Sequence, residues 1–549
     1  MLNPTETAFN RLDLAFANFL AQRAALNPAQ IPAFTTLVAR LSYEQSQGHS
    51  CIFLEKTEQN LILASGLALT IELSQGLEIT ETQPLVLQNQ CLYTHRYWFY
   101  ETRLAEQIKQ RLTQKYEIAT LETALDNYFP PQANHETDWQ RAAAKMALTQ
   151  AFAIVTGGPG TGKTTTVVKI LALLQEFAEQ PLHIALAAPT GKAAMRLQES
   201  IGASIEKLSC SATIKSQIPQ EVKTLHRLLG ARPPSPYFHH NADKPLPYDV
   251  VVIDEVSMVD LALMSKLVDA LKNGARLILL GDKDQLASVE SGAVLADFTS
   301  SLPNHTVELQ KSHRFHGEIK KLAVAVNQQQ GKIAWDLLVK GGEQIHLLTE
   351  DLITYIAQKQ QPYLALIKQG ADFKQVFAAF NEFQVLCSNR QGENGINDIN
   401  QRVEKKLHLS GHWYSGRPVM MTQNNAAMQL YNGDIGICMP DKELHNRLMV
   451  FFLRPDGSVK KVLPTRLPPC ETVFAMTIHK SQGSEFNEVL MVLPKKMNPI
   501  LTKELIYTAI TRAKQCVKVV ADAEIFTFAV SKRIQRYGGL AAKLQNNVL

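Results

Sequence analysis

Residues 157–164 read "GGPGTGKT" and match G-x-x-x-x-G-K-[ST], a pattern that binds nucleotide phosphates. They follow the strand-like "FAIVT" and precede the helix-like "TTVVKILALLQEF", the context that this motif requires. Glycines let backbone N–H groups turn toward phosphate oxygens, and a helix N-terminus favours an anion. We predict that Lys163 reaches the β- and γ-phosphates and that Thr164 binds Mg²⁺. The predicted nucleotide-binding residues here are Gly157, Gly158, Pro159, Gly160, Thr161, Gly162, Lys163, Thr164 and Thr165.

An acidic pair follows a second strand-like stretch, in "VVVIDEVSMVD" at residues 250–260. Its β-branched residues predict a buried strand that ends at Asp254 and Glu255. One carboxylate can complete the shell of a bound Mg²⁺, and the adjacent one can orient and deprotonate an attacking water. We predict Asp254 as the metal ligand and Glu255 as the base. Solvation of a strand end is the plainer alternative, which the upstream phosphate motif disfavours.

A third strand-like stretch, "LILLGDKDQLASVESG", delivers Asp282, Asp284 and Gln285 to the same predicted sheet edge. An amide both donates and accepts hydrogen bonds, so Gln285 suits the sensing of a γ-phosphate beside a water. Taken alone, an ordinary turn from strand to helix explains this stretch about equally well.

These polar groups need a sheet to hold them. Short apolar stretches alternate with helical patterns from about residue 140 onward, which predicts a parallel sheet covered by helices on both faces. A second set of apolar strands follows at 383–389, 472–478, 488–494 and 516–522. Between them, residues 413–470 are rich in short β signals, with turn pairs at Asn432-Gly433 and Asp456-Gly457. We predict an α/β protein whose second domain carries a small inserted β module.

The first hundred residues show helical patterns and no phosphate or metal motif. They hold five basic and eight acidic residues, so the chain's net charge of +5 leaves +8 for the rest, where we expect a polyanion to bind. The aromatic run "LYTHRYWFYE" is best explained by core packing, although base stacking is possible. Docking of a partner protein is the better functional hypothesis for this acidic segment.

The composition, 45% hydrophobic and 19% charged over 549 residues, is that of an ordinary globular protein with several domains. We find no secretion signal and no apolar run long enough to cross a membrane. Seven scattered cysteines are best explained as reduced thiols of a cytoplasmic protein.

No N-K-x-D pattern is present to read guanine, and "LSGH" stands in the wrong order for a transporter ATPase. The order of motifs resembles superfamily 1 DNA helicases, and most closely the RecD family, the alpha subunits of bacterial exodeoxyribonuclease V. The matching stretches are "DWQRAAAKMAL" (138–148), "GGPGTGKTTT", "APTGKAAMRL" (188–197), "TLHRLLG" (224–230), "VIDEVSMVD", "LGDKDQLASVESG", "SHRF" (312–315), "NRQGENGINDIN" (389–400), "TIHKSQGSEF" (477–486) and "YTAITRAK" (507–514).

The resemblance implies roles for further residues. Gln140 resembles the glutamine that reads adenine, and the substrate is then ATP with Mg²⁺. Arg314 and Arg512 resemble two arginine fingers, which neutralise the charge of a phosphoryl transition state. Contacts with DNA are implied for Pro189, Thr190, Gly191, Lys192, Thr224 and His226.

Residues 477–486, "TIHKSQGSEF", resemble helicase motif V at the end of a strand in the second domain. The resemblance implies that Gly483 and Glu485 face the nucleotide cleft. It also implies that the polar run before them, His479, Lys480, Ser481 and Gln482, contacts DNA. A polar turn between core strands explains each residue singly but not the set, so the loop is predicted to pass the state of the nucleotide to the grip on DNA.

Taken together, the motifs predict two RecA-like P-loop domains, an inserted SH3-like β module and a mainly helical N-terminal domain. The expected bounds are 1–114 for partner docking, 115–345 for the ATP-binding domain, 346–412 with 471–549 for the second RecA-like domain, and 413–470 for the module. The resemblance implies 5′ to 3′ movement on DNA beside RecB and RecC, in the repair of double-strand breaks.

No convincing nuclease cluster is found outside the ATPase motifs, so the chain alone is not expected to cut DNA. Two alternatives stay open. One is a free-standing RecD-like helicase, and the other is a regulatory P-loop ATPase that does not move along DNA.

Overall fold

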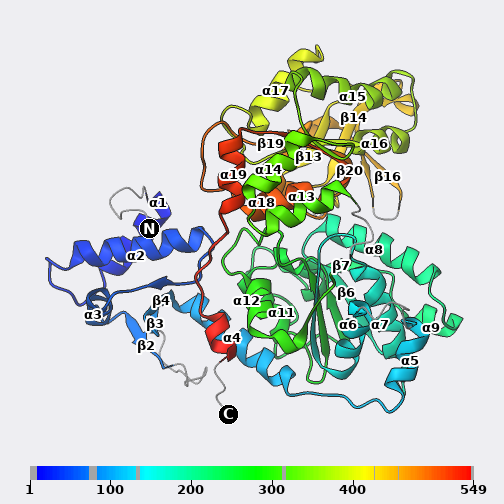
Figure 1. Cartoon of the computed structure of the whole chain (residues 1–549). Coiled ribbons are helices and arrows are strands. Elements are labelled where there is room, and N and C mark those ends of the chain that lie inside the picture. Colours follow the sequence, from blue (N-terminus) through cyan, green and yellow to red (C-terminus); the bar gives the residue numbers. More distant parts are fainter. Residues whose placement is uncertain are drawn as a thin grey trace.

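The protein is described as a computed structural model, which covers residues 9–72, 83–130, 137–311, 317–425, 427–454 and 457–545. Within these residues the chain builds four sheets, two of them wholly parallel. In Figure 1 the N-terminal part, in blue, lies beside two α/β bodies, one cyan to green and the other light green to red. The site lies where these two bodies meet.

The first parallel sheet has the strand order β10-β5-β9-β8-β6-β7. Its four central strands are those predicted from the apolar stretches, and the short edge strands β7 and β10 are additional. Each central strand ends at one of the polar motifs, so all the motifs meet at one edge. The strands are β5 (Phe152–Thr156), β6 (Ile184–Ala188), β7 (Val222–Thr224), β8 (Val250–Ile253), β9 (Arg276–Gly281) and β10 (Thr306–Glu308).

Helices cover both faces of this sheet, each face having its own apolar core. Several begin at a side-chain cap: Asp138 accepts from the backbone N–H of Gln140 at 3.0 Å, which fixes the start of α6. The helices are α5 (Leu121–Tyr128), α6 (Trp139–Thr149), α7 (Lys163–Phe177), α8 (Gly191–Glu206), α9 (Ala212–Gln217), α10 (Leu225–Leu229), α11 (Leu261–Asp269) and α12 (Val294–Ser301), with 3₁₀ turns η1 (Val256–Met258) and η2 (Pro303–His305).

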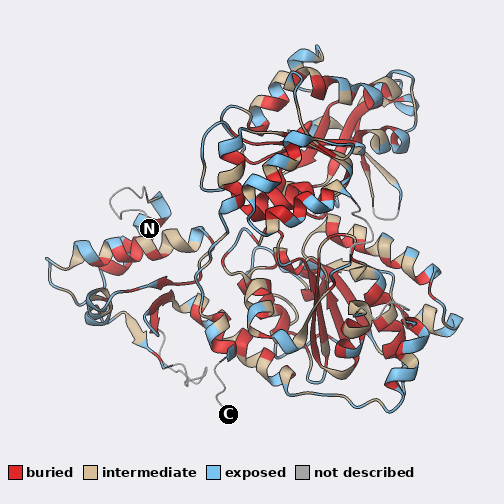
Figure 2. Cartoon of the chain, viewed as in Figure 1, coloured by how far each residue is buried: buried red, intermediate tan, exposed pale blue. Residues whose placement is uncertain are grey.

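The second parallel sheet has the order β11-β20-β19-β12-β18, and four of its strands are those predicted. The elements are α13 (Glu318–Asn327), α14 (Gly331–Lys340), β11 (Ile345–Leu347), α15 (Leu352–Lys368), α16 (Phe373–Asn381), β12 (Phe383–Cys387), α17 (Ile396–Lys406), β18 (Ala475–Thr477), η5 (Ile478–Ser481), β19 (Phe486–Val492), α18 (Lys503–Ile510), β20 (Ala513–Val520) and α19 (Ala523–Ser531). Figure 2 shows both parallel sheets buried along their strands.

The inserted module is a five-stranded antiparallel sheet in the order β16-β15-β14-β13-β17. Gly433 has φ +94° in the connection from β13 to β14, as the predicted turn requires. Asp456 of the other predicted turn lies outside the described residues. The elements are β13 (Pro418–Met421), β14 (Ile435–Asp441), η3 (Lys442–Leu444), β15 (Arg447–Leu453), β16 (Val459–Val462), η4 (Pro464–Arg466) and β17 (Cys470–Thr472).

The N-terminal part is helical, and it also holds a four-stranded sheet in the order β1-β4-β3-β2 that the sequence did not indicate. Its strands span two to four residues, too short for a visible alternation. In the aromatic run, core packing is confirmed for Tyr93 and Trp98, whereas Phe99 is 40% exposed. The elements are α1 (Arg11–Ala21), α2 (Ile31–Ser46), β1 (Ile52–Phe53), α3 (Lys56–Ala64), β2 (Ala68–Thr70), β3 (Leu85–Gln88), β4 (Cys91–Thr94) and α4 (His95–Leu112).

The segment after α19 runs back from the second domain to the N-terminal part and ends in α20 (Leu540–Gln545), beside α4, as the red trace in Figure 1 shows. Arg536 in this segment donates to the carbonyls of Glu290 and Gly292, both at 2.8 Å. Lys543 of α20 forms a buried ion pair of 2.7 Å with Glu101 of α4. We call residues 532–545 the strap.

All seven cysteines are free thiols. Within the described part of the chain, every helix is too short or too polar to cross a lipid bilayer.

Candidate nucleotide and DNA site

The phosphate-binding loop connects β5 to α7. Gly162 immediately precedes α7 with φ +87°, a left-handed conformation that favours glycine, so the free N–H groups of the helix start face the cleft. The ammonium group of Lys163 donates to the carbonyl oxygens of Gly157 at 2.6 Å and Gly158 at 3.2 Å. The lysine thus lies folded onto its own loop, and phosphate oxygens would replace these carbonyl acceptors.

The acidic pair stands at the end of β8, as predicted. The Asp254 carboxylate accepts from the backbone N–H of Glu255 at 2.8 Å. Burial, followed by the neighbouring charge of Glu255, raises the pKa of Asp254 to about 6. A cation beside this carboxylate would reverse the shift, and Thr164 lines the same cavity. The donor set of a hydroxyl and a carboxylate fits Mg²⁺.

Gln285 and Arg512 meet across the two domains. The Gln285 amide nitrogen donates to Asp282 at 3.0 Å, and its oxygen accepts from the Arg512 guanidinium at 2.8 Å. Arg512 is only 1% exposed, and burial lowers its pKa. The second domain therefore places an arginine directly on the predicted sensor of the first.

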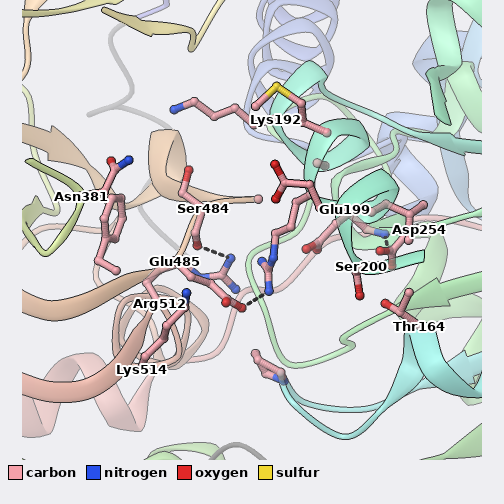
Figure 3. A pocket seen from close by; sticks show the side chains of 18 of the residues that line it. Thr164, Lys192, Glu199, Ser200, Asp254, Asn381, Ser484, Glu485, Arg512 and Lys514 are labelled. Carbon is pink, nitrogen blue, oxygen red and sulfur yellow. Dashed lines mark hydrogen bonds and ion pairs between the residues drawn. The ribbon is translucent and has the colours of Figure 1, made fainter. Parts of the chain in front are cut away.

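A cavity of about 1160 Å³ opens between the domains. Figure 3 shows Thr164 and Asp254 on one side of it and Glu485 and Arg512 on the other. Glu485 forms an ion pair with Arg196 of α8 across the cavity. The predicted nucleotide-binding residues Gln140, Pro159, Gly160, Gly162, Thr165 and Gly483 also line it.

Some of the predicted nucleotide-binding residues form contacts that hold the phosphate-binding loop and its surroundings in place. The Gln140 side chain donates to the Thr161 carbonyl at 3.3 Å, so it contacts the phosphate-binding loop from α6. The Thr161 hydroxyl donates to the Gly158 carbonyl at 2.9 Å. Gly483 has φ +73° and lies against the start of α8, where a Cβ would stand 3.3 Å from the Ala193 nitrogen.

Both predicted DNA-binding lysines lie beside the connection between β13 and β14. Lys480 donates to the Asn432 side chain at 2.6 Å. The Lys192 ammonium is buried and without a hydrogen-bond partner among the described residues, and Asp434 is the acidic group facing it. Arg227, whose guanidinium stands 4.6 Å from the Tyr431 ring centroid, joins them. We call residues 431–434 the module loop.

The other predicted DNA-binding residues take varied positions. Pro189 and Gly191 flank Thr190 at the start of α8, and the hydroxyls of Thr190 and Thr224 cap α8 and α10. Burial lowers the pKa of both His226 and His479. Their contacts with DNA stay predictions.

Ser481 and Gln482 point inward. The Ser481 hydroxyl is fully buried and donates to the Ile478 carbonyl at 2.7 Å, and the Gln482 side chain donates to the Leu286 carbonyl at 3.0 Å. In this conformation Gln482 joins the two domains, whereas Ser481 bonds within its own turn. Arg314 lies outside the described residues, so its predicted role as a finger stays a prediction.

Several residues at the junction were missed by the sequence reasoning. Lys503 donates to Asp284 at 3.2 Å, Tyr507 donates to Asp282 at 3.1 Å, and Thr508 accepts from the Leu286 N–H at 3.0 Å. Polar residues at helical spacing just before "AITRAK" were the available signal.

Known families match three parts of the chain. The AAA domain matches residues 140–291, the UvrD-like helicase C-terminal domain matches 472–520, and the N-terminal domain of RecBCD enzyme subunit RecD matches 5–81. RecBCD enzyme subunit RecD of Mycolicibacterium smegmatis is 40% identical over 84% of this chain and 84% of its own length. The chain belongs to the RecD family.

Other members and relatives agree. The RecD subunit of Haemophilus influenzae is 34% identical, covering 85% of this chain and 82% of its own. The ATP-dependent RecD2 DNA helicase of Deinococcus radiodurans is 31% identical over 69% of this chain but only 48% of its own length. As a RecD-family member with both helicase domains, the chain is a helicase of the superfamily that its motifs indicated.

Proposed function

We propose that this chain is the ATP-driven 5′ to 3′ DNA helicase of a RecBCD-type helicase–nuclease, acting at DNA ends in double-strand break repair and recombination. The observation that supports it best is the Arg512–Gln285 hydrogen bond of 2.8 Å, which joins the two halves of the nucleotide cleft. An arginine from the second domain makes hydrolysis depend on closure, and a motor requires such a dependence.

In the proposed reaction, Lys163 leaves the carbonyls of its own loop and binds the phosphates of ATP. Glu255 orients the attacking water and accepts its proton, while Arg512 and Arg314 neutralise charge on the transferred phosphoryl group. Thr164 and Asp254 would hold Mg²⁺, which neutralises phosphate charge when bound.

The contacts with DNA would change when the nucleotide cleft closes or opens. Lys192 belongs to the first domain and Lys480 to the second, so closure alters the spacing of two cations that can hold strand phosphates. Lys480 lies two residues before Gln482, which is bonded to the Leu286 carbonyl beside Gln285. A change at the nucleotide therefore has a short path to the DNA-binding lysines.

The N-terminal part, residues 1–114, is proposed to dock on the RecB or RecC subunit in the cytoplasm. Leu12 and Phe19, on one face of α1, are 74% and 52% exposed, and apolar side chains in this arrangement suit a protein interface. The bounds predicted for the other units were 115–345, 346–412 with 471–549, and 413–470 for the module. Because α13, α14 and β11 pack with the second domain, that domain is proposed to begin near residue 317 rather than 346. The module is proposed to extend to residue 472, where β17 ends. Cutting of DNA is assigned to another subunit.

A free-standing RecD-like helicase is the second candidate, because RecD2 of Deinococcus radiodurans is 31% identical. However, the N-terminal domain of RecBCD enzyme subunit RecD matches residues 5–81, and the identity to the Mycolicibacterium smegmatis RecD is 40%, which favours the subunit.

The test is an unwinding assay on duplexes that carry a 5′ or a 3′ single-stranded tail, using wild type and Lys163→Ala. We expect unwinding from the 5′ tail only, and none with Lys163→Ala, because the phosphates lose their cation. Unwinding from 3′ tails alone would overturn the polarity and with it the RecD-type motor. Absence of single-strand-stimulated ATP hydrolysis would instead support a regulatory ATPase.

A further inference from the structure

Side chains of α18 and of the residues just after it form hydrogen bonds with a single loop of the first domain, the loop that holds Gln285. Lys503, Tyr507 and Arg512 contact, in order, Asp284, Asp282 and Gln285 of that loop. Lys503 and Tyr507 are four residues apart and lie on one face of α18, and Arg512 follows two residues after the helix ends. Three polar side chains of the loop thus have a partner from the second domain, whereas Lys283 pairs with Glu308 of the first.

Tyr507 differs from the others because it stands behind the phosphate-binding loop. It is 5% exposed, and its hydroxyl donates to Asp282 Oδ2 at 3.1 Å. A Cβ on Gly158 would stand 3.0 Å from that hydroxyl. Tyr507 is not one of the described residues that line the nucleotide cavity. It would therefore act through a neighbouring residue rather than on ATP directly.

Its neighbour Asp282 fixes the orientation of Gln285. Both the Tyr507 hydroxyl and the Gln285 amide nitrogen donate to Asp282 Oδ2, while Oδ1 accepts from the Asp284 N–H at 3.1 Å. With its nitrogen on Asp282, the Gln285 amide can only present its oxygen to Arg512. Loss of the phenol hydroxyl removes one of two donors to a buried carboxylate oxygen, so the carboxylate and the amide it holds can shift.

We propose that Tyr507 is a positioning residue for ATP hydrolysis, whose hydroxyl sets the Asp282–Gln285 pair that holds Arg512 in the cleft. The inference rests on the proposed function, because it assigns a role in the same reaction. It predicts an effect on the hydrolysis step and not on ATP binding, since the contact lies behind the phosphate-binding loop.

The experiment compares wild type and Tyr507→Phe, which keeps the ring and removes only the hydroxyl. Steady-state ATP hydrolysis is measured with saturating oligo-dT, together with the dissociation constant for ADP. We expect kcat to fall by about tenfold or more, the usual loss for a hydrogen bond to a charged group. The KM for ATP and the ADP affinity should stay within about twofold of wild type.

Tyr363→Phe is the matched control. Tyr363 is 1% exposed, and its hydroxyl donates to the Gly416 carbonyl at 2.8 Å, between α15 and the start of the module. Both variants lose one buried hydrogen bond, so both should lower the thermal midpoint, and only Tyr507→Phe should lower kcat.

An unchanged kcat in Tyr507→Phe, an equal loss of kcat in both variants, or a rise in KM alone would each overturn the inference. A wild-type chain whose hydrolysis oligo-dT does not stimulate would overturn the proposed function itself, and the inference with it.

Discussion

At the scale of single residues, the Lys192 ammonium is held in an environment that disfavours its charge. Burial lowers its pKa to about 8, Asp434 opposes the shift, and Lys480 adds to it. The residue as a whole is half-buried while the ammonium itself is buried. A strand phosphate beside the nitrogen would favour the charged form, so the proposed binding of DNA at Lys192 would be coupled to its protonation.

This coupling predicts a pH-dependent affinity for single-stranded DNA. The bound phosphate raises the pKa of Lys192 above its value in the free chain, so binding takes up a proton once the pH exceeds about 8. Affinity for labelled oligo-dT, measured by fluorescence anisotropy, should fall as pH rises through that region, by up to about tenfold per pH unit. At lower pH the lysine is already charged and this dependence should vanish.

Lys192→Arg is the control, because a guanidinium stays charged throughout. The variant should show a shallower pH dependence than wild type, the remainder coming from groups such as Lys480, whose pKa is also lowered by burial. Equal slopes in the two proteins would show that Lys192 is not the titrating group.

At the scale of elements, the short helix η5 and the residue after it join the domains. Gln482 donates to the Leu286 carbonyl, next to the Gln285 that holds Arg512. Lys480 of the same turn contacts the module loop through Asn432. One turn therefore contacts the loop that holds Gln285 on one side and the module loop on the other.

Removing the Gln482 side chain should uncouple ATP hydrolysis from the binding of DNA. Gln482→Ala leaves the Leu286 carbonyl buried and unpaired, at a cost of about 1–3 kcal/mol. We expect ADP affinity close to wild type, with the stimulation of ATP hydrolysis by oligo-dT largely lost. Gln361→Ala, at an exposed position of α15, should change neither quantity. Full stimulation in Gln482→Ala would refute the joining role of η5.

The sequence could predict what lies along a strand and at its end. The eight strands predicted in the two parallel sheets, and the polar residues that follow them, were readable because a parallel core strand is apolar throughout. It could not predict which residue of one domain meets which of the other. Tyr507 and Ser481 look alike in a pattern of polar residues near core strands, and only the folded chain shows that both face inward. The strands of the N-terminal sheet are too short to carry a periodic signal.

At the scale of the whole molecule, the strap ties three parts together. Arg536 donates to carbonyls of the loop at 288–292, which follows the loop that holds Gln285. Next to it, the carbonyl of Tyr537 accepts from the Ser50 N–H at 2.9 Å. Glu101 accepts from the Ser50 hydroxyl at 2.5 Å and from Lys543 at 2.7 Å. The N-terminal part, the first domain and the strap thus share one buried polar cluster.

Removing only one partner of the Lys543–Glu101 ion pair should destabilise the protein more than replacing both partners. Lys543→Met leaves the Glu101 carboxylate buried without its cation, which costs about 3–5 kcal/mol. The double variant Glu101→Gln with Lys543→Met removes the unpaired charge and should recover part of the loss. Scanning calorimetry measures both. A double variant less stable than Lys543→Met would contradict this view of the pair.

The strap also sets an order of events during synthesis. Ser50 and Tyr537 are hydrogen-bonded partners although 487 residues separate them along the chain. The N-terminal part leaves the ribosome before the two ATPase domains, yet Glu101 stays without Lys543 until residue 543 has been made. Domains generally fold in the order of their synthesis, and long-range contacts close last. The N-terminal part therefore completes its buried polar cluster only after both ATPase domains have been translated.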